Sequence, residues 1–223
     1  MSREEFAEQV IVLKVGVFRE IDCWVRFFSP SRGIVTGFAF GGCKSRRRFS
    51  GCLDELNHVW FRISSSKNSD YLILNEGSLL HRFSRLHQNL SRLGMAVNCL
   101  KFLEAAHIGH GDAERVFHVL YRTLLMLDQE DRIPAQLPLL FRAKLTCEYG
   151  YRPDFSRCIA CGRLLQNRET IFFQSRHGKV LCSDCSKAEN EGQPLSFELY
   201  HYLQTLLSEN PEAWAKAPEP QEW

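Results

Sequence analysis

The sequence lacks any run of apolar residues long enough to cross a lipid bilayer. Its most hydrophobic stretch, residues 116–127, is broken by His118 and Arg122, whereas a membrane-spanning helix needs about 20 consecutive apolar residues. The first residues are not expected to form a secretory leader, because Met1 is followed by the acidic segment Ser-Arg-Glu-Glu and by no apolar core. These absences predict a cytoplasmic protein with no membrane partner.

The sequence also lacks the short motifs of common hydrolases and nucleotide-binding enzymes. It contains no H-E-x-x-H, no G-x-S-x-G and no phosphate-loop motif. Within residues 8–76 no strand alternates with a long helix, which disfavours a nucleotide-binding α/β sheet. Because nothing assembles a nucleophile, a base and an orienting acid, we expect a protein that is not an enzyme.

The net charge of the 223-residue chain is only +2, but its positive charge is concentrated near the start. Between residues 14 and 50, two acidic residues stand against eight basic ones: Lys14, Arg19, Arg26, Arg32, Lys44, Arg46, Arg47 and Arg48. From residue 193 to 223 the balance reverses, with five glutamates against Lys216. A basic segment of this kind indicates contact with a polyanion.

Residues 8–76 have the composition of β structure. Short runs rich in β-branched and aromatic residues are separated by turn clusters such as 29–33 and by the polar loop 64–69. The runs that we expect to form strands are 9–15, 23–28, 34–40, 57–63 and 71–74. Five short strands with turns between them predict a small barrel.

From about Ser78 the apolar residues recur every three to four positions, which predicts amphipathic helices. We expect Gly94 to separate the first helix from the second, Asp112 to cap the third, and Gly150 to end the fourth. The expected segments are 78–93, 97–106, 116–127 and 139–147. Together they predict a compact helical bundle.

Nine cysteines, an odd number, favour thiols and metal ligands over a disulfide framework in a cytoplasmic chain. Five of them are scattered among apolar neighbours: Cys23, Cys43, Cys52, Cys99 and Cys147. We interpret these five as small buried hydrophobes.

The other four cysteines form two C-x-x-C pairs, Cys158 with Cys161 and Cys182 with Cys185, separated by twenty residues. Two such knuckles supply the four thiolates that zinc binds in a tetrahedron. The segment between them predicts a β-hairpin with its turn at His177. A redox C-x-x-C would be single, and a catalytic zinc keeps one position open, so we predict one structural zinc ion.

A second cluster, His107, His110 and Asp112, has the residue types of a metal site. It lies between two helices beside glycines and has no evident fourth ligand, so we interpret it as a capping loop. The alternative is a zinc hydrolase that acts on nucleic acid through these three ligands.

The basic segment is interleaved with aromatic residues. Lys44, Arg46, Arg47 and Arg48 directly follow the third expected strand. Single-stranded nucleic acid is commonly bound by cations along its backbone and aromatic rings against its bases. Alternation along a strand places about half of the rings in the core, and a short cationic run is often a solvated loop. We interpret the loop as phosphate-binding, and the further candidates for DNA contact are Lys14, Arg19, Arg26, Trp24 and Phe38. An adaptor that binds only protein through a zinc ribbon is the alternative.

The order of these modules resembles the RecO family of bacterial recombination mediators. Three segments carry the resemblance: residues 10–14 with Glu20 and Asp22 after them, residues 31–37 with the basic stretch that follows to residue 46, and residues 141–153 leading into Cys158. The resemblance covers residues 8 to 190.

The resemblance implies an α+β fold, with an N-terminal OB-fold barrel and a helical bundle that carries an inserted four-cysteine zinc finger. The implied division is residues 1–78 for the OB-fold domain, 79–153 for the helical domain, 154–190 for the zinc finger and 191–223 for a C-terminal helix and tail packed on the helical domain.

The resemblance also implies binding of single- and double-stranded DNA, annealing of complementary strands, and a partnership with RecR. A further implied partner is the acidic C-terminal tail of single-stranded DNA-binding protein (SSB), so that RecA can load onto coated DNA. The family assigns tail recognition to the helical domain. Arg115, Arg122 and Arg142 are candidates there, because the tail is acidic and hydrophobic.

Overall fold

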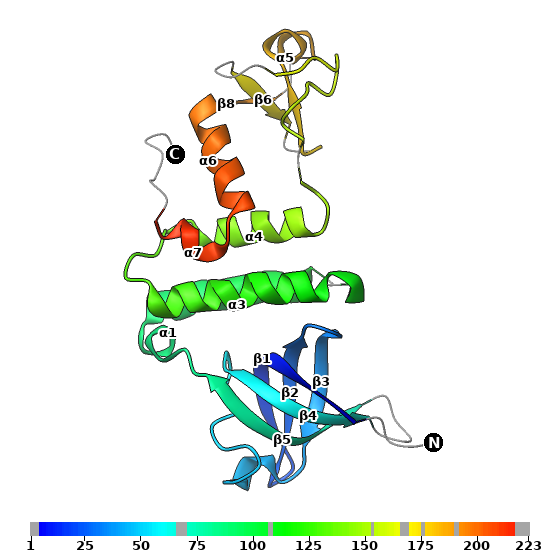
Figure 1. Cartoon of the computed structure of the whole chain (residues 1–223), viewed down its shortest axis with the longest axis vertical. Helices are drawn as coiled ribbons and strands as arrows, with labels where there is room; N and C mark the ends of the chain where they lie inside the picture. The colour runs from blue at the N-terminus through cyan, green and yellow to red at the C-terminus, as the bar shows by residue number, and fades with distance from the viewer. Residues whose placement is uncertain are drawn as a thin grey trace. The chain divides into compact units, whose positions relative to one another are not determined.

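The computed structural model describes residues 5–65, 71–106, 109–152, 154–165, 170–174, 177–189 and 192–216 (Figure 1). By its internal contacts the chain divides into two compact units, Met1–Asp131 and Arg132–Trp223. Each unit is described by itself. Within the described residues, no helix has the length and apolar character needed to span a membrane.

The first unit begins with five strands that close into a barrel. The strands are β1 (Glu5–Phe18), β2 (Asp22–Ser29), β3 (Gly33–Ala39), β4 (His58–Ser65) and β5 (Leu72–His81). Their order around the barrel is β1-β2-β3-β5-β4, and β4 pairs with β1 to close it. The β3–β5 pair is parallel and the other pairs are antiparallel. The predicted five-stranded barrel is confirmed.

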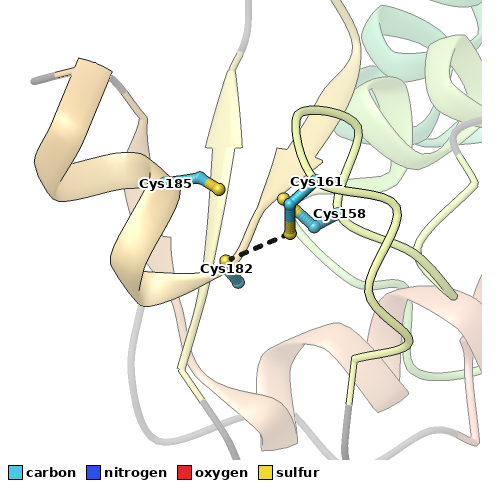
Figure 2. Close-up of side chains that lie close together, drawn as sticks. All are labelled: Cys158, Cys161, Cys182 and Cys185. Atoms are coloured by element: carbon cyan, nitrogen blue, oxygen red, sulfur yellow. Dashed lines mark hydrogen bonds between the residues drawn. The ribbon is translucent and has the colours of Figure 1, made fainter.

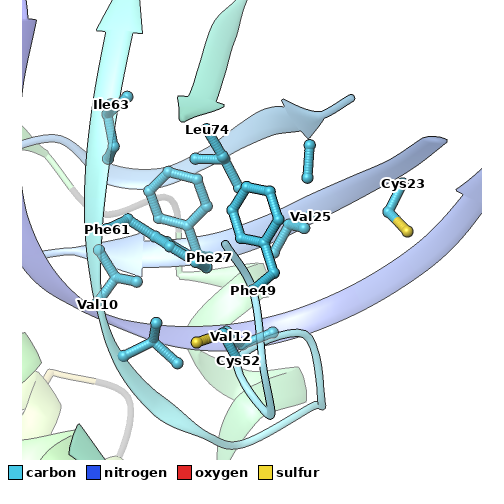
Figure 3. Close-up of a cluster of buried hydrophobic side chains, with 12 residues drawn as sticks. Val10, Val12, Cys23, Val25, Phe27, Phe49, Cys52, Phe61, Ile63 and Leu74 are labelled. Atoms are coloured by element: carbon cyan, nitrogen blue, oxygen red, sulfur yellow. The ribbon is translucent and has the colours of Figure 1, made fainter. Parts of the chain in front are cut away.

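The barrel is filled by alternate residues of its strands, as strand geometry requires (Figure 3). Val25 and Phe27 point inward from β2, and Phe61 meets Phe27 edge to face with 5.8 Å between ring centroids. Phe49, which follows the basic segment, is also buried in this core. The far end of the basic segment is therefore fixed to the barrel by a buried aromatic ring.

Three helices complete the first unit: α1 (Ser84–Gln88), α2 (Leu90–Ala105) and α3 (Ala113–Gln129), with the short 3-10 helix η2 (His110–Asp112) before α3. Helix α3 packs on the barrel through Phe117, whose ring lies 5.8 Å from that of Phe28 on β2. Asp128 near the end of α3 accepts hydrogen bonds from the backbone N–H groups of Arg85 and Leu86. Its carboxylate thus caps the start of α1.

The predicted start of the first helix is wrong. Residues 79–81 continue β5, where Leu79 pairs with Val59 and His81 with His58 of β4. The predicted break at Gly94 is also wrong, because α2 runs through that residue and begins after Asn89, whose side chain accepts from the N–H groups of its first turn. Strand pairing and a cap outweigh the apolar periodicity.

Helix α3 begins after Asp112, as predicted, but the Asp112 carboxylate is not its cap. That carboxylate pairs with the guanidinium of Arg115 instead. The alternative metal site cannot be placed on the structure, because His107 and the side chain of His110 lie outside the described residues.

The second unit combines helices with a small sheet. Its elements are α4 (Leu137–Glu148), β6 (Ile171–Gln174), β7 (Lys179–Leu181), α5 (Ser183–Glu189), β8 (Gln193–Leu195), α6 (Phe197–Ser208) and α7 (Pro211–Trp214). The predicted hairpin is present as β6 and β7, and β8 adds a third strand that the sequence did not predict. Lys144 on α4 donates to the carbonyl of Leu207 over 2.6 Å, which joins α4 to α6.

The interpretation of the scattered cysteines is correct in part. Cys52 and Cys99 are buried thiols, and Cys147 is a half-buried one. Cys23 and Cys43 instead form a disulfide, and Cys43 is exposed. The cause is long-range pairing: Cys23 lies opposite Ala39 in the β2–β3 ladder, and the chain turns back toward Cys23 within four residues.

Candidate metal centre and nucleic-acid interface

Two loops of the second unit bring the four predicted ligands together. Cys158 and Cys161 lie on a tight turn in which the N–H of Gly162 donates to the carbonyl of Cys158 over 2.8 Å. Gly162 has a φ of 73°, which glycine adopts without steric cost. Cys182 follows β7 and Cys185 lies on α5, so the second pair is held by the junction of strand and helix.

The four sulfur atoms lie within 4.8 Å of one another, and those of Cys161 and Cys182 are 3.9 Å apart (Figure 2). A tetrahedron with zinc–sulfur bonds of 2.3 Å has sulfur–sulfur edges of about 3.8 Å. The cluster therefore fits zinc in geometry and in ligand chemistry. Four cysteines fill the coordination shell and leave no position for a reactive water.

The protein environment prepares part of this cluster as thiolate. Burial alone would raise the pKa of Cys158, but backbone N–H groups of Cys161, Cys182 and Ala160 outweigh it and lower the pKa to about 6. The backbone N–H of Cys185 likewise lowers the pKa of Cys182. Hydrogen bonds with Cys182 and Cys161 raise the pKa of Cys185. Zinc must therefore displace a proton from Cys185 to bind.

The metal cluster is also part of a small core. Cys158 and Cys182 are buried with Leu181, and Leu165 and Phe172 pack against them. A separate cluster of Phe155, Ile171 and Val180 lies beside α6, where Tyr200 packs against it. These cores are small, so a metal bound by the four cysteines would have a large share in holding this part of the second unit together.

In the first unit, the outer face of the barrel carries two cross-strand rows of the predicted DNA-binding residues. Lys14 on β1 lies opposite Arg26 on β2. Two pairs further along, Trp24 on β2 lies between Gly16 of β1 and Phe38 of β3. These residues alternate with the core positions, so their side chains lie on the outside of the barrel.

Aromatic rings form a continuous surface on this face. The ring of Phe38 lies 5.4 Å from that of Phe18 and 5.3 Å from that of Tyr71, both edge to face. The indole of Trp24 covers Gly16 so closely that a Cβ there would lie 2.2 Å from the ring. Phe18 and Tyr71 were not among the predicted contacts, because their proximity to Phe38 depends on strand register.

The basic loop, which we define as residues 44–48, follows β3 through the 3-10 helix η1 (Gly42–Lys44). Lys44, Arg46 and Arg47 are exposed, and their side chains take part in no ion pair or hydrogen bond within the described part of the chain. They are therefore available to phosphates.

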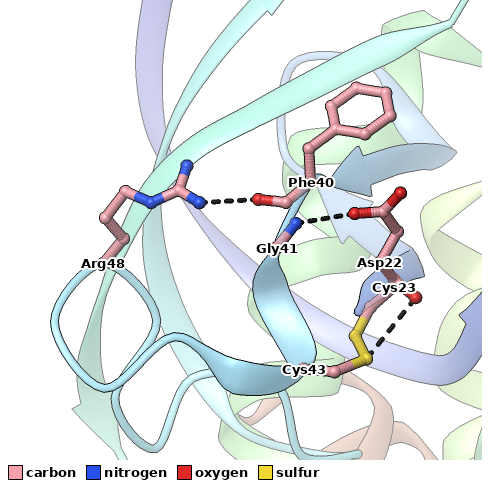
Figure 4. Close-up of a disulfide and its surroundings, with 6 residues drawn as sticks. All are labelled: Asp22, Cys23, Phe40, Gly41, Cys43 and Arg48. Carbon is pink, nitrogen blue, oxygen red and sulfur yellow. Dashed lines mark hydrogen bonds between the residues drawn. A yellow bond between two sulfur atoms is a disulfide. The ribbon is translucent and has the colours of Figure 1, made fainter. Parts of the chain in front are cut away.

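Arg48 has a different environment from the other loop cations. Its guanidinium donates to the carbonyl of Phe40 over 2.6 Å (Figure 4). It also donates to the carbonyl of Asn75 at 3.4 Å. The start of the loop is held where the N–H of Gly41 donates to the Asp22 carboxylate over 2.7 Å. Arg48 and Asp22 thus fix the conformation of the loop.

The remaining predicted cations of the barrel are distributed around the same face. Lys14 is exposed. The guanidinium of Arg19 lies 4.9 Å from the ring centroid of Phe18, and Arg26 forms an ion pair of 3.3 Å with Glu104 on α2. Arg26 therefore has to exchange a carboxylate for a phosphate if it contacts DNA.

The three arginines considered for partner binding belong to different units of the chain. Arg115 and Arg122 lie on α3 in the first unit, and Arg142 lies on α4 in the second. The second unit does contain an apolar pocket of about 1020 Å³, lined among others by Phe155, Ile159, Phe173 and Leu203. Arg152, Arg157 and Lys179 also line this pocket.

Two family models match the chain and together cover nearly all of it. The model described as Recombination protein O N terminal matches residues 1–83, and the model described as Recombination protein O C terminal matches residues 87–222. The chain belongs to the RecO family. The resemblance to this family, which the order of modules predicted, is thus confirmed by matches in both units.

Curated RecO proteins are similar to the chain over most of their length. DNA repair protein RecO of Oleidesulfovibrio alaskensis is 42% identical over 220 residues, which are 98% of this chain and 89% of the relative. That of Solidesulfovibrio magneticus is 43% identical over 213 residues, 95% and 85% of the two chains. That of Lawsonia intracellularis is 34% identical over 210 residues, 94% and 84%. The chain is therefore a member of a family of DNA-repair proteins.

Proposed function

We propose that this protein is a cytoplasmic, non-enzymatic recombination mediator that binds single- and double-stranded DNA and anneals complementary strands. The observation that carries the proposal is the basic loop beside the half-exposed aromatic surface of a closed OB-fold barrel. Exposed cations attract phosphates, and the rings of Phe38 and Trp24 offer faces against which bases stack. The predicted divisions at residues 153 and 190 are retained as part of this proposal, and the end of the barrel domain moves from residue 78 to residue 81, where β5 ends.

Annealing follows from the same chemistry. Two strands attracted to cations on one molecule, or on neighbouring molecules, reach a high local concentration while their repulsion is screened. Base pairing then proceeds without a covalent step, which is why no catalytic residues are required. The zinc ion, held by four thiolates, serves only to stabilise the second unit.

The family role also supplies the proposed partners. RecR is one, and the acidic tail of SSB is another, so that RecA is loaded onto coated single-stranded DNA. For the tail we propose the apolar pocket of the second unit, because Arg152, Arg157 and Lys179 beside an apolar floor complement an acidic and hydrophobic peptide. The exposed Ile159 on this floor, 53% accessible, is the position to test.

Strand annealing tests the function directly. We expect the protein to accelerate pairing of complementary oligonucleotides, with and without SSB, and to lose the acceleration on coated strands when the SSB tail is removed. An adaptor that binds only protein would not shift an oligonucleotide in a gel at moderate salt. Failure of DNA binding and annealing alike would contradict the proposal.

The pocket is tested separately with the tail peptide. We expect Ile159→Asp to abolish peptide binding, because it places a negative charge on the apolar floor that an acidic peptide must cover. Leu164→Asp is the matched control, since Leu164 is similarly exposed, at 58%, and does not line the pocket. Equal loss in both variants would reject the pocket as the tail site.

A further inference from the structure

Cys23 and Cys43 join the start of β2 to the turn that leads into the basic loop (Figure 4). Their Cα atoms are 6.1 Å apart across twenty residues of sequence, a separation that a disulfide spans without backbone movement. Cys23 is buried in the barrel core, whereas Cys43 is exposed and directly precedes Lys44. We propose that this pair is a reversible thiol–disulfide switch that sets the order of the basic loop and hence its affinity for DNA.

The switch acts on one end of the loop. The far end is fixed by the buried ring of Phe49 in either redox state. At the near end, three hydrogen bonds are non-covalent ties. The N–H of Cys43 donates to the carbonyl of Ile21 over 3.1 Å, the N–H of Gly41 donates to Asp22, and the guanidinium of Arg48 donates to the carbonyl of Phe40. The disulfide adds a covalent link to these contacts, and opening it leaves the near end to non-covalent ties.

In the reduced state, the thiol of Cys43 has a hydrogen-bond acceptor nearby. The sulfur of Cys43 lies 3.4 Å from the carbonyl oxygen of Asp22, which a protonated thiol would use as acceptor. Opening the disulfide therefore leaves the polar groups of the turn with partners. The barrel need not unfold for the switch to operate.

The two cysteines differ in exposure, so the exposed Cys43 reacts first in thiol–disulfide exchange and the buried Cys23 reacts second. The Cys43 thiolate attacks one sulfur of a low-molecular-weight disulfide, forms a mixed disulfide and expels one small thiolate. The Cys23 thiolate then attacks the sulfur of Cys43 and expels the second. The protein loses two thiol protons to the two departing thiolates and is oxidised, and the small disulfide is reduced to two thiols.

The oxidised state is the one that binds DNA more tightly. A loop that is already ordered loses less conformational freedom when Lys44, Arg46 and Arg47 contact phosphates. We expect the dissociation constant for a single-stranded oligonucleotide to be about three- to tenfold lower in the oxidised protein. This inference rests on the proposed function, since it describes regulation of the same loop.

The test uses the full chain with its zinc, treated with glutathione disulfide or with a phosphine reductant. Peptide mapping detects the Cys23–Cys43 cross-link, fluorescence anisotropy measures DNA affinity, and a colorimetric assay confirms that zinc is retained. Cys43→Ser is the decisive variant, because this exposed side chain can change without disturbing the core. Cys147→Ser is the matched control, because it removes a free cysteine outside the barrel and leaves the Cys23–Cys43 pair intact.

We expect oxidation to tighten DNA binding in the wild type and in Cys147→Ser, reversibly, and to leave Cys43→Ser at the affinity of the reduced wild type. Absence of the cross-link, equal affinity of both redox states, or a shift that persists in Cys43→Ser would each overturn the switch. A wild type that binds no DNA in either state would instead overturn the proposed function.

Discussion

The guanidinium of Arg48 donates a hydrogen bond of 2.6 Å to the backbone carbonyl of Phe40. This contact closes the segment that leaves β3, passes through η1 and returns to the barrel at Phe49. One cation of the basic loop therefore stabilises the conformation in which the others, Lys44, Arg46 and Arg47, are presented to solvent. Of the four cations that lie together in the sequence, one stabilises the loop and three are exposed for contact with a ligand.

We expect Arg48→Ala to lower both the free energy of unfolding and the affinity for DNA. Loss of a charge-assisted hydrogen bond at a partly exposed site costs about 1 kcal/mol, which urea denaturation measures. Arg46→Ala removes the same charge without a protein partner, so it should weaken DNA binding at unchanged stability. Equal stability of the two variants would show that the Arg48–Phe40 contact does not hold the loop.

Phe38 is expected to contribute to single-stranded DNA binding through base stacking. Phe38→Ala should weaken binding of a single-stranded oligonucleotide about tenfold, because stacking on one ring contributes about 1–3 kcal/mol. Duplex DNA should be affected less, because its bases are already stacked on one another. Leu79→Ala, which also removes an apolar side chain exposed on the barrel, at 38%, is the control. An equal loss for duplex would argue against stacking.

The four-cysteine cluster was predictable from sequence, because its members are two local pairs whose spacing is typical of a zinc site. The five strands of the barrel were also predictable, because each is marked locally by a run of β-branched and aromatic residues between turn clusters. The start of the first helix and the continuity of α2 through Gly94 were not predicted correctly. The pairing of Leu79 with Val59 and the cap by Asn89 outweigh the apolar periodicity there. The Cys23–Cys43 link and the ring contacts of Phe38 depend on register between strands, which no local pattern encodes.

Zinc should bind less tightly as the pH falls. The pKa of Cys158 in the metal-free cluster is lowered to about 6, so below that pH zinc must displace a proton from this thiol as well as from Cys185. Zinc release can be followed with a chromogenic chelator. Cys161→Ser should release zinc at higher pH than Cys147→Ser. A zinc affinity that does not depend on pH between 7 and 5 would contradict a thiolate cluster.

Removal of zinc should affect the second unit selectively. The small core around Leu181 depends on the metal cluster, whereas the barrel has its own core. A strong chelator should therefore expose amide protons of residues 158–185 to exchange and leave those of β1 to β5 protected. Loss of protection throughout the barrel would show that the zinc has a wider role.

His58 should make the first unit less stable in acid. Burial, together with the nearby His81, lowers the pKa of His58 to about 4, and its Nε2 has no hydrogen-bond partner among the described residues. The unfolded chain binds this proton near pH 6.5, so the free energy of unfolding should fall as the pH drops from about 6.5 to 4, by about 3 kcal/mol.

The pH effect at His58 is measured by urea denaturation at successive pH values. The variant His58→Asn should lose most of the dependence within this window, even if it is less stable throughout. His87→Asn, which removes a part-exposed histidine, should retain it. A wild type of constant stability from pH 6.5 to 4 would contradict the assignment.

The central claim is that cations of the basic loop contact DNA phosphates, and the salt dependence of affinity tests it most directly. Arg46→Ala with Arg47→Ala should lower the slope of log affinity against log salt by about 1.4 for single-stranded DNA, since each phosphate contact contributes about 0.7. Lys101→Ala with Lys187→Ala removes two exposed cations from α2 and α5 and should leave the slope unchanged. An unchanged slope in the loop variant, or an equal fall in both, would contradict the account.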